Sequence, residues 1–285
     1  KTWGNVRKLS AQMPHHGEWL EKNDLAEFSR AAKISGAGFY FLKGGMALLE
    51  LALQRFAIDS LSKKGFTPVT PPFMMNRAAY EGVTSLDDFE KVMYKIDGHD
   101  AYLIATSEHP LTAMYKDEVL DEDSLPIQLC GISTCFRREI GAHGLDTKGI
   151  FRVHQFNKVE QIVLCKPEDS WAWHEKMQEN AEEFFQKLEI PHQVVSICTG
   201  DIGIVAAKKY DVEAWMPREQ KYREVTSASN CTAYQAARLN IKYRIGKQGA
   251  QDERKEFFHT LNATAIATSR ALRAVIENHM QDDGT

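Results

Sequence analysis

A run of charged and aromatic residues between positions 137 and 160 has the spacing of a ligand-binding surface. Arg137 and Glu139 are two residues apart, so on a strand their side chains point to one face, about 6.6 Å apart. An arginine fork suits phosphate oxygens, an aromatic ring stacks on a nucleotide base, and a carboxylate holds an ammonium group. Five alternating positions of the next predicted strand share one face: Arg152, His154, Phe156, Lys158 and Glu160.

That face could hold a base, a phosphate and an amine in one row. Phe156 and Glu160 would lie about 13 Å apart along the strand. Burying so many charges without a ligand is costly, which favours a binding function. The alternative is a solvent-exposed sheet surface with ion pairs, because charge alternation is common on strands.

Two further clusters contain groups that bind metal ions or anions. Glu224 and Ser227 supply a carboxylate and a hydroxyl, oxygen ligands that Mg²⁺ accepts alongside phosphate. Arg270 begins a predicted helix after a strand of small residues, and a helix N-terminus beside an arginine is an anion site. Each cluster has a structural alternative, namely a polar strand and turn for the first and an ordinary first-turn arginine for the second.

The sequence lacks the motifs of several other classes of protein. The sequence has no GxxxxGK[ST] loop, no GxGxxG after a strand and no GxSxG turn, which argues against P-loop, Rossmann and hydrolase sites. The five cysteines include no CxxC pair, and the histidines, including the adjacent His15 and His16, show no ligand spacing, so no zinc is expected. The odd cysteine count indicates a reducing, cytoplasmic compartment, and no apolar run reaches the roughly 20 residues of a membrane span. With a net charge of -4, a nucleic acid would not be held by surface charge alone.

The predicted elements that carry these residues form an α+β domain. Apolar residues at helical spacing after Gly45 predict a helix that ends at Gly65, and the proline-rich stretch 65–73 is an extended edge segment. Residues 141–150 predict a long hairpin loop. Because strands joined by hairpins are flanked by helices, the sheet is expected to be antiparallel. The other expected elements are strands at 126–139, 153–165, 192–198, 222–229 and 259–267, and helices at 169–188 and 268–280.

The order of these clusters resembles the three signature motifs of the class II aminoacyl-tRNA synthetases. GFTPVTPPF (65–73) resembles motif 1, with Pro72 as its signature proline. FRRE (136–139) together with RVHQFNKVE (152–160) resembles motif 2, and NATAIATSRAL (262–272) resembles motif 3. Within that class, FYFLKGGMALLE, YLIATSEHPL, GLDTKGIFRVHQFNKVE and EVTSASNCT resemble the seryl-tRNA synthetase family of the common, non-zinc type, across nearly the whole chain.

This resemblance implies a serine-tRNA ligase, which activates serine with ATP to seryl-adenylate and transfers serine to the 3′ end of tRNA(Ser). It implies Mg²⁺ as the metal, a homodimer, a cytoplasmic location, and no membrane or DNA partner. It also implies that residues 1–285 form one class II catalytic domain, from which the family's N-terminal tRNA-binding helical hairpin and its extreme C-terminus are absent.

The motifs also imply a role for each site residue. Arg137, which would hold the α-phosphate of ATP, and Arg270, which would lie on the adenine face opposite Phe156 and near the γ-phosphate, are the expected catalytic residues. The expected ATP-binding residues are Arg137, Glu139, Arg152, Phe156, Glu224, Ser227 and Arg270, with Glu224 and Ser227 holding Mg²⁺. The expected serine-binding residues are Thr106, Glu108, Arg137, Glu160, Asn230 and Thr232, with Glu160 taking the ammonium group.

Some positions depart from the family pattern. Ala233 and Ala237 stand where many relatives have Asp and Arg, and motif 3 has alanines where many relatives have glycines. An alternative hypothesis is therefore a catalytically reduced paralogue with a structural or regulatory role, although the retained arginines and carboxylates argue against it. A threonyl or prolyl ligase is a third hypothesis, and the absence of a Cys/His zinc set disfavours the zinc-dependent threonyl type.

Overall fold

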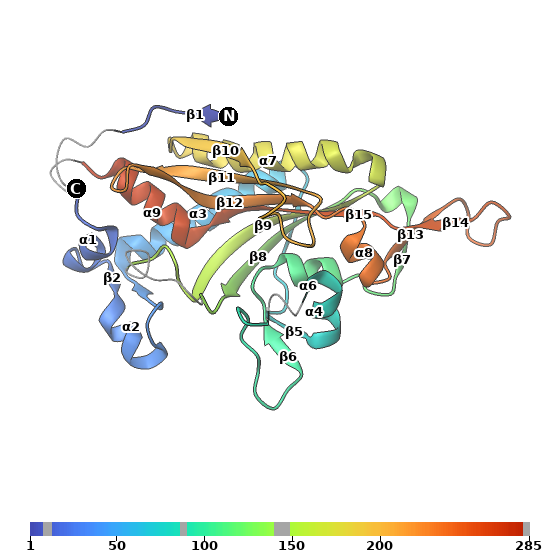
Figure 1. Cartoon of the computed structure of the whole chain (residues 1–285), viewed down its shortest axis with the longest axis horizontal. Coiled ribbons are helices and arrows are strands. Elements are labelled where there is room, and N and C mark those ends of the chain that lie inside the picture. Colours follow the sequence, from blue (N-terminus) through green and yellow to red (C-terminus); the bar gives the residue numbers. More distant parts are fainter. Residues whose placement is uncertain (8–12, 86–89, 140–148, 282–285) are drawn as a thin grey trace.

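One eight-stranded sheet forms the centre of the protein (Figure 1). The structure is a computed structural model, which describes residues 1–7, 13–85, 90–139 and 149–281 of the chain. All neighbouring strands of this sheet are antiparallel except the edge pair β4 and β8, which is parallel. In spatial order the strands are β1 (Thr2–Trp3), β10 (His192–Ser196), β11 (Lys208–Met216), β12 (Lys221–Asn230), β15 (His259–Ala267), β9 (Gln155–Cys165), β8 (Ile127–Phe136) and β4 (Thr67–Val69).

Helices and three smaller sheets surround this sheet. The described helices are α1 (His16–Lys22), α2 (Phe28–Ser35), α3 (Gly44–Lys63), α4 (Arg77–Val83), α6 (Glu108–Ala113), α7 (Ser170–Lys187), α8 (Tyr234–Arg238) and α9 (Thr268–His279). The smaller sheets are β14 (Arg254–Glu256) with β13 (Lys242–Ile245) and β7 (Val119–Asp121), β2 (Ala26–Glu27) with β3 (Phe41–Leu42), and β5 (Met74–Asn76) with β6 (Ala101–Leu103). Within the described residues, no helix combines the length and apolarity needed to cross a bilayer.

Alternate side chains of β9 belong to two different cores, one on each face of the sheet. Val159 and Val163 belong to the core that also contains the apolar residues of α3, α7 and α9. Ile162 and Leu164 belong to a second core with α4, α6 and α8 on the other face. In Figure 1, α7 accordingly lies above the sheet, and α4, α6 and α8 lie below it. Because successive side chains of a strand point to opposite faces, Phe156, Lys158 and Glu160 lie on the second face.

The expected antiparallel α+β fold is confirmed, and the long elements lie close to their predicted positions. The helix expected after Gly45 spans Gly44–Lys63, and the proline-rich segment contributes β4 at the edge of the sheet. Lys208–Met216 was not expected as a strand, although it is the β11 partner of β12. Most of the hairpin loop expected at 141–150 lies outside the described residues.

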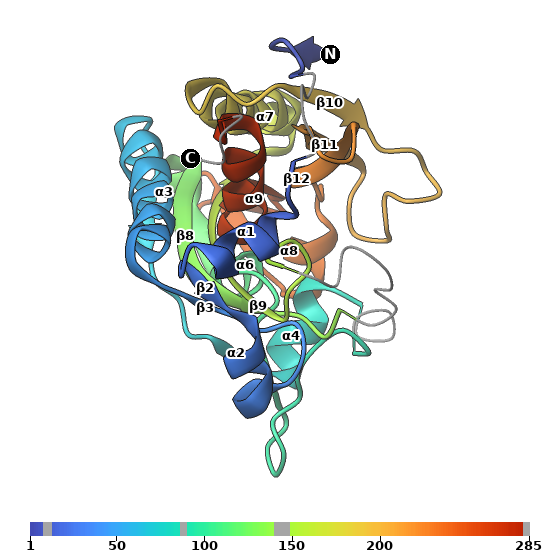
Figure 2. The ribbon, with the colours of Figure 1, turned by 90° about the vertical axis from the view of Figure 1, so that its left-hand side faces the viewer.

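The N-terminal region lies beside the C-terminal helix. Helix α1 contacts α9, and Figure 2 shows α1 in front of α9 at the end of the sheet. His15 precedes α1, and its Nδ1 accepts a hydrogen bond from Gly17 N at 3.1 Å, which caps the helix. His16 and Leu20 of α1 are buried.

Candidate active site

A cavity of about 710 Å³ lies on the face of the sheet that carries α4, α6 and α8. Its walls come from the β8–β9 hairpin, β12, β15, the start of α6 and residues 202–206. Nine of the residues expected from the sequence line this cavity: Thr106, Glu108, Arg137, Glu139, Phe156, Glu160, Glu224, Ser227 and Arg270. Three others, Arg152, Asn230 and Thr232, do not line it.

Buried charges are concentrated in one part of the cavity wall. Lys158 Nζ lies 2.7 Å from Glu160 Oε2, and each of these side chains is less than a tenth exposed. Burial, and then the charge of Glu160, raise the pKa of Glu108 to about 7, although Lys158 acts against this shift. The sequence placed Lys158 on the correct face but gave it no role; the structure shows it as the ion-pair partner of Glu160.

Gln235 of α8 holds Glu108 in place. Its Nε2 donates to Glu108 Oε1 at 2.9 Å and to Val83 O at 3.1 Å, while its Oε1 accepts from Thr260 Oγ1 at 2.6 Å. The amide is almost completely buried and bonds to three segments that are distant in sequence. Sequence reasoning missed this residue because nothing local indicates that α8 reaches the cavity.

The two unusual alanines lie on either side of Gln235. Ala233 is the N-cap position of α8 and makes no side-chain cap bond, and Ala237 is exposed. Neither alanine lines the cavity. An aspartate at an N-cap would accept a bond from the first turn, so the alanine affects the short helix α8 more directly than the cavity.

Arg137 directly follows β8, at the end of the paired part of the β8–β9 hairpin. Its backbone N donates to His154 O at 2.9 Å, so the strand pairing continues one step beyond Phe136. Its Nε donates to Ala105 O at 3.2 Å, and its Cζ lies 5.3 Å from the centroid of the Phe156 ring. A fixed guanidinium beside an aromatic ring on the cavity wall is the arrangement that the sequence predicted for a phosphate next to a base.

The expectation of one continuous face from Arg152 to Glu160 is wrong. Strand β9 begins at Gln155. The alternation therefore holds for Phe156, Lys158 and Glu160, which line the cavity, but not for Arg152 and His154, which do not. Arg152 Nη1 instead lies 3.7 Å from Glu139 Oε2. His154 packs against the ring of Phe39, 5.3 Å away between centroids.

A β-bulge brings Glu224 and Ser227 to the same cavity. Residues three apart on a regular strand point to opposite faces. In β12, however, Thr226 pairs with Val212 and Glu224 pairs with Glu213, so Val225 is an extra residue and is buried in the core. The bulge therefore turns Glu224 towards the cavity that Ser227 also lines.

Arg270 of α9 is the ion-pair partner of Glu224. The Nη1 atom of Arg270 lies 2.9 Å from Glu224 Oε1 and 3.3 Å from Glu224 O. Burial at the cavity wall opposes ionisation of Glu224, but the charge and hydrogen bond of Arg270, together with the charges of Lys209 and Arg137, lower the pKa of this carboxyl group. Arg270 Cζ also lies 5.6 Å from the centroid of the Phe151 ring. The carboxylate is thus held in its charged form beside a cation on the cavity wall.

Asp211 of β11 lies next to this pair and was not expected from the sequence. It pairs across the sheet with Ser227, and its buried Oδ1 has no hydrogen-bond partner among the described residues, although Lys209 Nζ lies 4.0 Å from it. Burial and the neighbouring Glu224 raise the pKa of Asp211 to about 6. Among the described residues, no group of three or more histidine, cysteine or acidic side chains forms a metal site by itself. Any ion held here would therefore need further ligands from a substrate or from water.

Asn230 and Thr232 lie behind the cavity wall. Asn230 is completely buried, and its Oδ1 accepts from Thr232 N at 2.9 Å. Thr232 has a positive φ of 47°, a backbone conformation that is uncommon for a residue with a side chain. Cys231, which lies between them, lines the cavity. The structure therefore places this turn beside the site without bringing either side chain to its surface.

Further cavity residues were missed. Residues 202–206 and Lys209 line the side nearest β11, and Ser229, Asn262 and Thr264 add polar groups from β12 and β15. A signal for β11 was present, since Val212, Ala214 and Met216 alternate and are all buried. The charged residues around it, Lys208, Lys209, Asp211 and Glu213, obscured that signal in the sequence.

Residues 91–279 match the family of the tRNA synthetase class II core domain (G, H, P, S and T). An antiparallel sheet with two arginines, an aromatic ring and buried carboxylates around one cavity agrees with that match. The chain therefore belongs to the class II aminoacyl-tRNA synthetases.

Within this class, the chain is a member of the seryl-tRNA synthetase family. It is 65% identical to the serine--tRNA ligase of Methanospirillum hungatei JF-1 over 285 residues, which cover 100% of this chain and 66% of that relative. It is 59% identical to the serine--tRNA ligase of Pyrococcus abyssi over 270 residues, which cover 95% of this chain and 58% of that relative. The chain thus spans slightly less than two thirds of the length of the curated relatives that it matches.

Solved structures show the same fold. The seryl-tRNA synthetase from Pyrococcus horikoshii, complexed with ATP, superposes with a TM-score of 0.92 at 57% identity and covers 97% of this chain and 61% of that chain. The cytoplasmic serine-tRNA ligase from Naegleria fowleri, in complex with AMP, superposes with a TM-score of 0.91 at 43% identity and covers 99% of this chain and 67% of that chain.

Proposed function

We propose that this chain is the catalytic part of a serine-tRNA ligase. It activates serine with ATP to seryl-adenylate and transfers serine to the 3′ end of tRNA(Ser). The observation that carries the proposal is a single cavity that combines the half-buried Glu108 and the buried Glu160 with the arginines Arg137 and Arg270. Relatives at 58–65% identity are serine--tRNA ligases, which supports the same substrate.

The acidic part of the cavity is the proposed serine pocket. Glu160 takes the ammonium group, and Glu108 and Thr106 complete the surroundings, while Arg137 reaches the carboxylate. The buried turn at Asn230 and Thr232 supports recognition of the side-chain hydroxyl from behind the wall. A pocket that hydrogen-bonds this hydroxyl rejects alanine, because its buried polar groups would otherwise be left unpaired.

The arginine part of the cavity is the proposed ATP site. Adenine stacks on Phe156, with Glu139 on its edge, and Arg137 neutralises the α-phosphate. Arg270 and Arg152 bind the outer phosphates. Arg152 lies outside the cavity wall, where it pairs with Glu139 at 3.7 Å, so a change of side-chain rotamer is part of this proposal.

Mg²⁺ fits the oxygen groups next to the proposed phosphate site. Mg²⁺ is usually held by one or two carboxylates together with substrate phosphates, and Glu224 and Ser227 offer a charged carboxylate and a hydroxyl on the cavity wall. The buried Oδ1 of Asp211, which lies 4.0 Å from Lys209 Nζ, belongs to a residue directly across the sheet from Ser227. When bound, the ion would neutralise charge on the leaving pyrophosphate.

The chemistry of the proposed first step needs no protein nucleophile. The serine carboxylate attacks the α-phosphorus of ATP, the bond to the bridging oxygen breaks, and pyrophosphate leaves. The protein orients the two reactants, and Arg137 and Arg270 stabilise the negative charge that builds up on the phosphate oxygens. In the second step a ribose hydroxyl of the tRNA 3′ end attacks the carbonyl of the adenylate, and AMP leaves.

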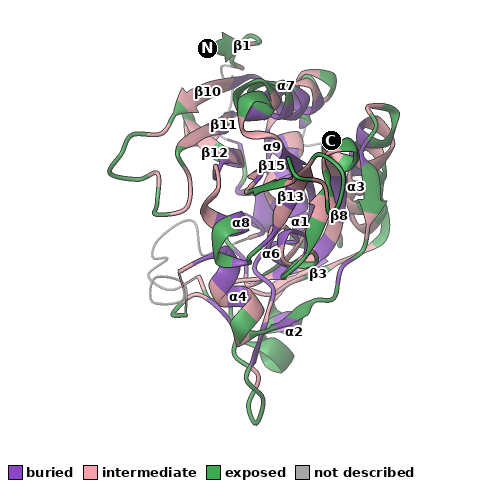
Figure 3. Cartoon of the chain, turned by 90° about the vertical axis from the view of Figure 1, so that its right-hand side faces the viewer, coloured by how far each residue is buried: buried purple, intermediate pink, exposed green. Residues whose placement is uncertain are grey.

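Other features of the proposal concern assembly and location. Leu48 and Leu51 of α3 are exposed. Figure 3 shows exposed residues along this helix, and an exposed apolar surface of this kind supports a homodimer through α3. All five cysteines are free thiols, which supports a cytoplasmic location. We further propose that residues 1–285 form one catalytic domain.

The pH dependence of serine activation provides one test of the pocket. Because burial and Glu160 raise the pKa of Glu108 to about 7, this carboxyl loses its proton as the pH rises through neutrality. We expect kcat/KM for serine to increase with pH and to level off above an apparent pKa near 7. The Glu108→Gln variant should lose this dependence, and a variant that keeps the wild-type profile would contradict the role of Glu108.

The proposed function itself is tested by ATP–pyrophosphate exchange with each of the common amino acids in turn. We expect exchange with serine and background rates with alanine and threonine. Exchange with threonine or proline instead would reassign the substrate. Folded protein that supports no exchange with any amino acid would favour the paralogue with a structural or regulatory role.

A further inference from the structure

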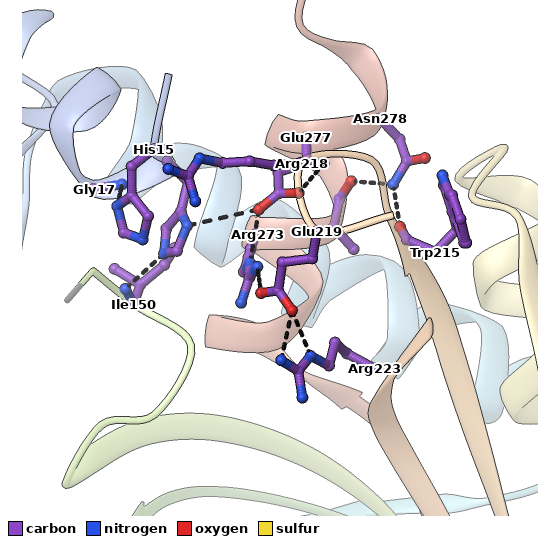
Figure 4. Close-up of polar contacts among 12 residues, drawn as sticks. His15, Gly17, Ile150, Trp215, Arg218, Glu219, Arg223, Arg273, Glu277 and Asn278 are labelled. Atoms are coloured by element: carbon purple, nitrogen blue, oxygen red, sulfur yellow. Dashed lines mark hydrogen bonds and ion pairs between the residues drawn. The ribbon is translucent and has the colours of Figure 1, made fainter. Parts of the chain in front are cut away.

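A network of charged residues, largely buried, lies on the part of α9 that comes after Arg270 in the sequence (Figure 4). Arg273 and Glu277 of α9 are almost completely buried, and Arg273 Nε donates to Glu277 Oε1 at 2.8 Å. A second guanidinium nitrogen of Arg273 bonds to Glu219 in the β11–β12 connection. Glu219 in turn accepts from Arg223 Nε at 2.6 Å. The network therefore links α9 to the beginning of β12.

His16 of α1 joins this network to the chain that enters β9. Its Nε2 lies 3.2 Å from Ile150 N, and a backbone N–H can only donate, so Nε2 is the acceptor. The proton of the neutral ring is then on Nδ1, which faces Glu277 Oε1 at 3.7 Å. Burial, and then the charge of Arg273, lower the pKa of His16 to about 2, so the ring is neutral at physiological pH.

The fit between His16 and residues 149–150 is tight. Gly149 has a φ of 90°, and a Cβ atom at this position would overlap the His16 imidazole. A Cβ atom on Gly17 would lie 3.0 Å from the Cα atom of Gly149. Ile150 is completely buried, so its N–H has no access to water if His16 stops accepting its bond. The imidazole therefore fixes the position of this backbone both by contact and by hydrogen bonding.

Phe151, the next residue in the chain, connects this part of the backbone to the cavity. The ring of Phe151 is only 5% exposed, and its centroid lies 4.6 Å from Arg273 Cζ and 5.6 Å from Arg270 Cζ. Arg270 lines the cavity, whereas Arg273 does not. The Phe151 ring therefore contacts one arginine of the buried network and one arginine of the cavity, and the attraction of a guanidinium for an aromatic face favours both contacts.

We propose that His16 is a positioning residue for the phosphate-binding part of the cavity. It holds the backbone of residues 149–150 against α9, so that Phe151 supports the guanidinium of Arg270 beside Glu224. This inference rests on the proposed function, because it assigns Arg270 to ATP. His16 touches neither substrate and transfers no proton, and its effect reaches the cavity through Ile150, Phe151 and Arg270.

Two variants of His16 distinguish the effect of its hydrogen bond from the effect of its side-chain volume. His16→Gln keeps an acceptor at a similar distance from the backbone, whereas His16→Leu fills the space but leaves Ile150 N–H without a partner. In serine-dependent pyrophosphate exchange, we expect His16→Leu to raise the KM for ATP about tenfold, the loss expected when one hydrogen bond no longer fixes the site. The KM for serine should stay within about twofold, and His16→Gln should be close to the wild type.

A substitution of Phe151 provides a second test of the contacts that lead from His16 to Arg270. Phe151→Leu keeps an apolar side chain but removes the aromatic face, and it should raise the KM for ATP without changing the KM for serine. Combined with His16→Leu, it should add little, because residues that act through one path are not additive. If His16→Leu does not fold, as judged from its thermal transition, Phe151→Leu and His16→Gln decide the question.

The outcomes distinguish this inference from the proposed function. A wild-type chain without serine-dependent exchange would overturn the function. An active wild type together with an unchanged KM for ATP in folded His16→Leu or Phe151→Leu would overturn only the positioning role. Equal increases in the KM for ATP and for serine would do the same, because a general loosening of the fold would affect both parts of the cavity.

Discussion

Arg137→Ala should reduce serine-dependent pyrophosphate exchange about a thousandfold, since the removal of one fixed donor from a developing negative charge has effects of this order. Arg137 lies beside the proposed adenine platform, with its Cζ 5.3 Å from the centroid of the Phe156 ring, and its Nε is fixed by the bond to Ala105 O. The loss should appear mainly in kcat, because the α-phosphate gains charge only in the transition state.

The fold should survive this substitution. Arg137 is partly exposed, follows the end of β8, and keeps its backbone bond to His154 O when the side chain is removed. The thermal transition should therefore remain close to that of the wild type. Arg137→Lys keeps the charge but loses the planar fork, so we expect intermediate activity. Near-normal exchange by a folded Arg137→Ala protein would remove Arg137 from the catalytic site.

Glu160→Gln should raise the KM for serine about a hundredfold or more, because the substrate ammonium would lose its charged partner in a buried site. The KM for ATP should change little, since Phe156 and the arginines lie farther along the cavity. The same substitution removes the partner of Lys158, whose Nζ lies 2.7 Å from Glu160 Oε2. A buried cation without its partner is strongly destabilising, so the thermal transition should also fall.

A double variant separates these two effects of Glu160. In Glu160→Gln with Lys158→Met, no unpaired charge remains, so much of the lost stability should return. The high KM for serine should persist, because the ammonium still lacks a carboxylate at position 160. Recovery of both stability and serine affinity in the double variant would show that Glu160 serves the pair with Lys158 and not the substrate.

Elements with strong local periodicity were predictable from the sequence. The helices at 44–63 and 170–187 and the strands at 127–136 and 155–165 were expected within a few residues of their observed ends. Their apolar residues repeat with the period of a helix or a strand, because these side chains must face a core. Strand β11 was missed because its first half is charged and lies beside the cavity, where that rule does not apply.

The candidate site was predictable where its residues share one regular strand. Phe156, Lys158 and Glu160 line the cavity, as their alternation indicated. The shared face does not extend to Arg152, because a sequence pattern does not show where a strand begins. Asn230 and Thr232 were predicted to bind serine, but neither side chain lines the cavity, because both lie in the turn behind its wall.

The sequence by itself determined the antiparallel α+β fold, the family, and most of the residues that line the cavity, since these depend on local periodicity and on motifs within short segments. Only the tertiary structure decided which groups meet across the sheet. The bulge at Val225, the bond from Gln235 to Glu108, and the path from His16 through Phe151 to Arg270 join segments up to 254 positions apart. Contacts of this kind form because buried polar groups must find partners in space, and no local pattern records which partner they find.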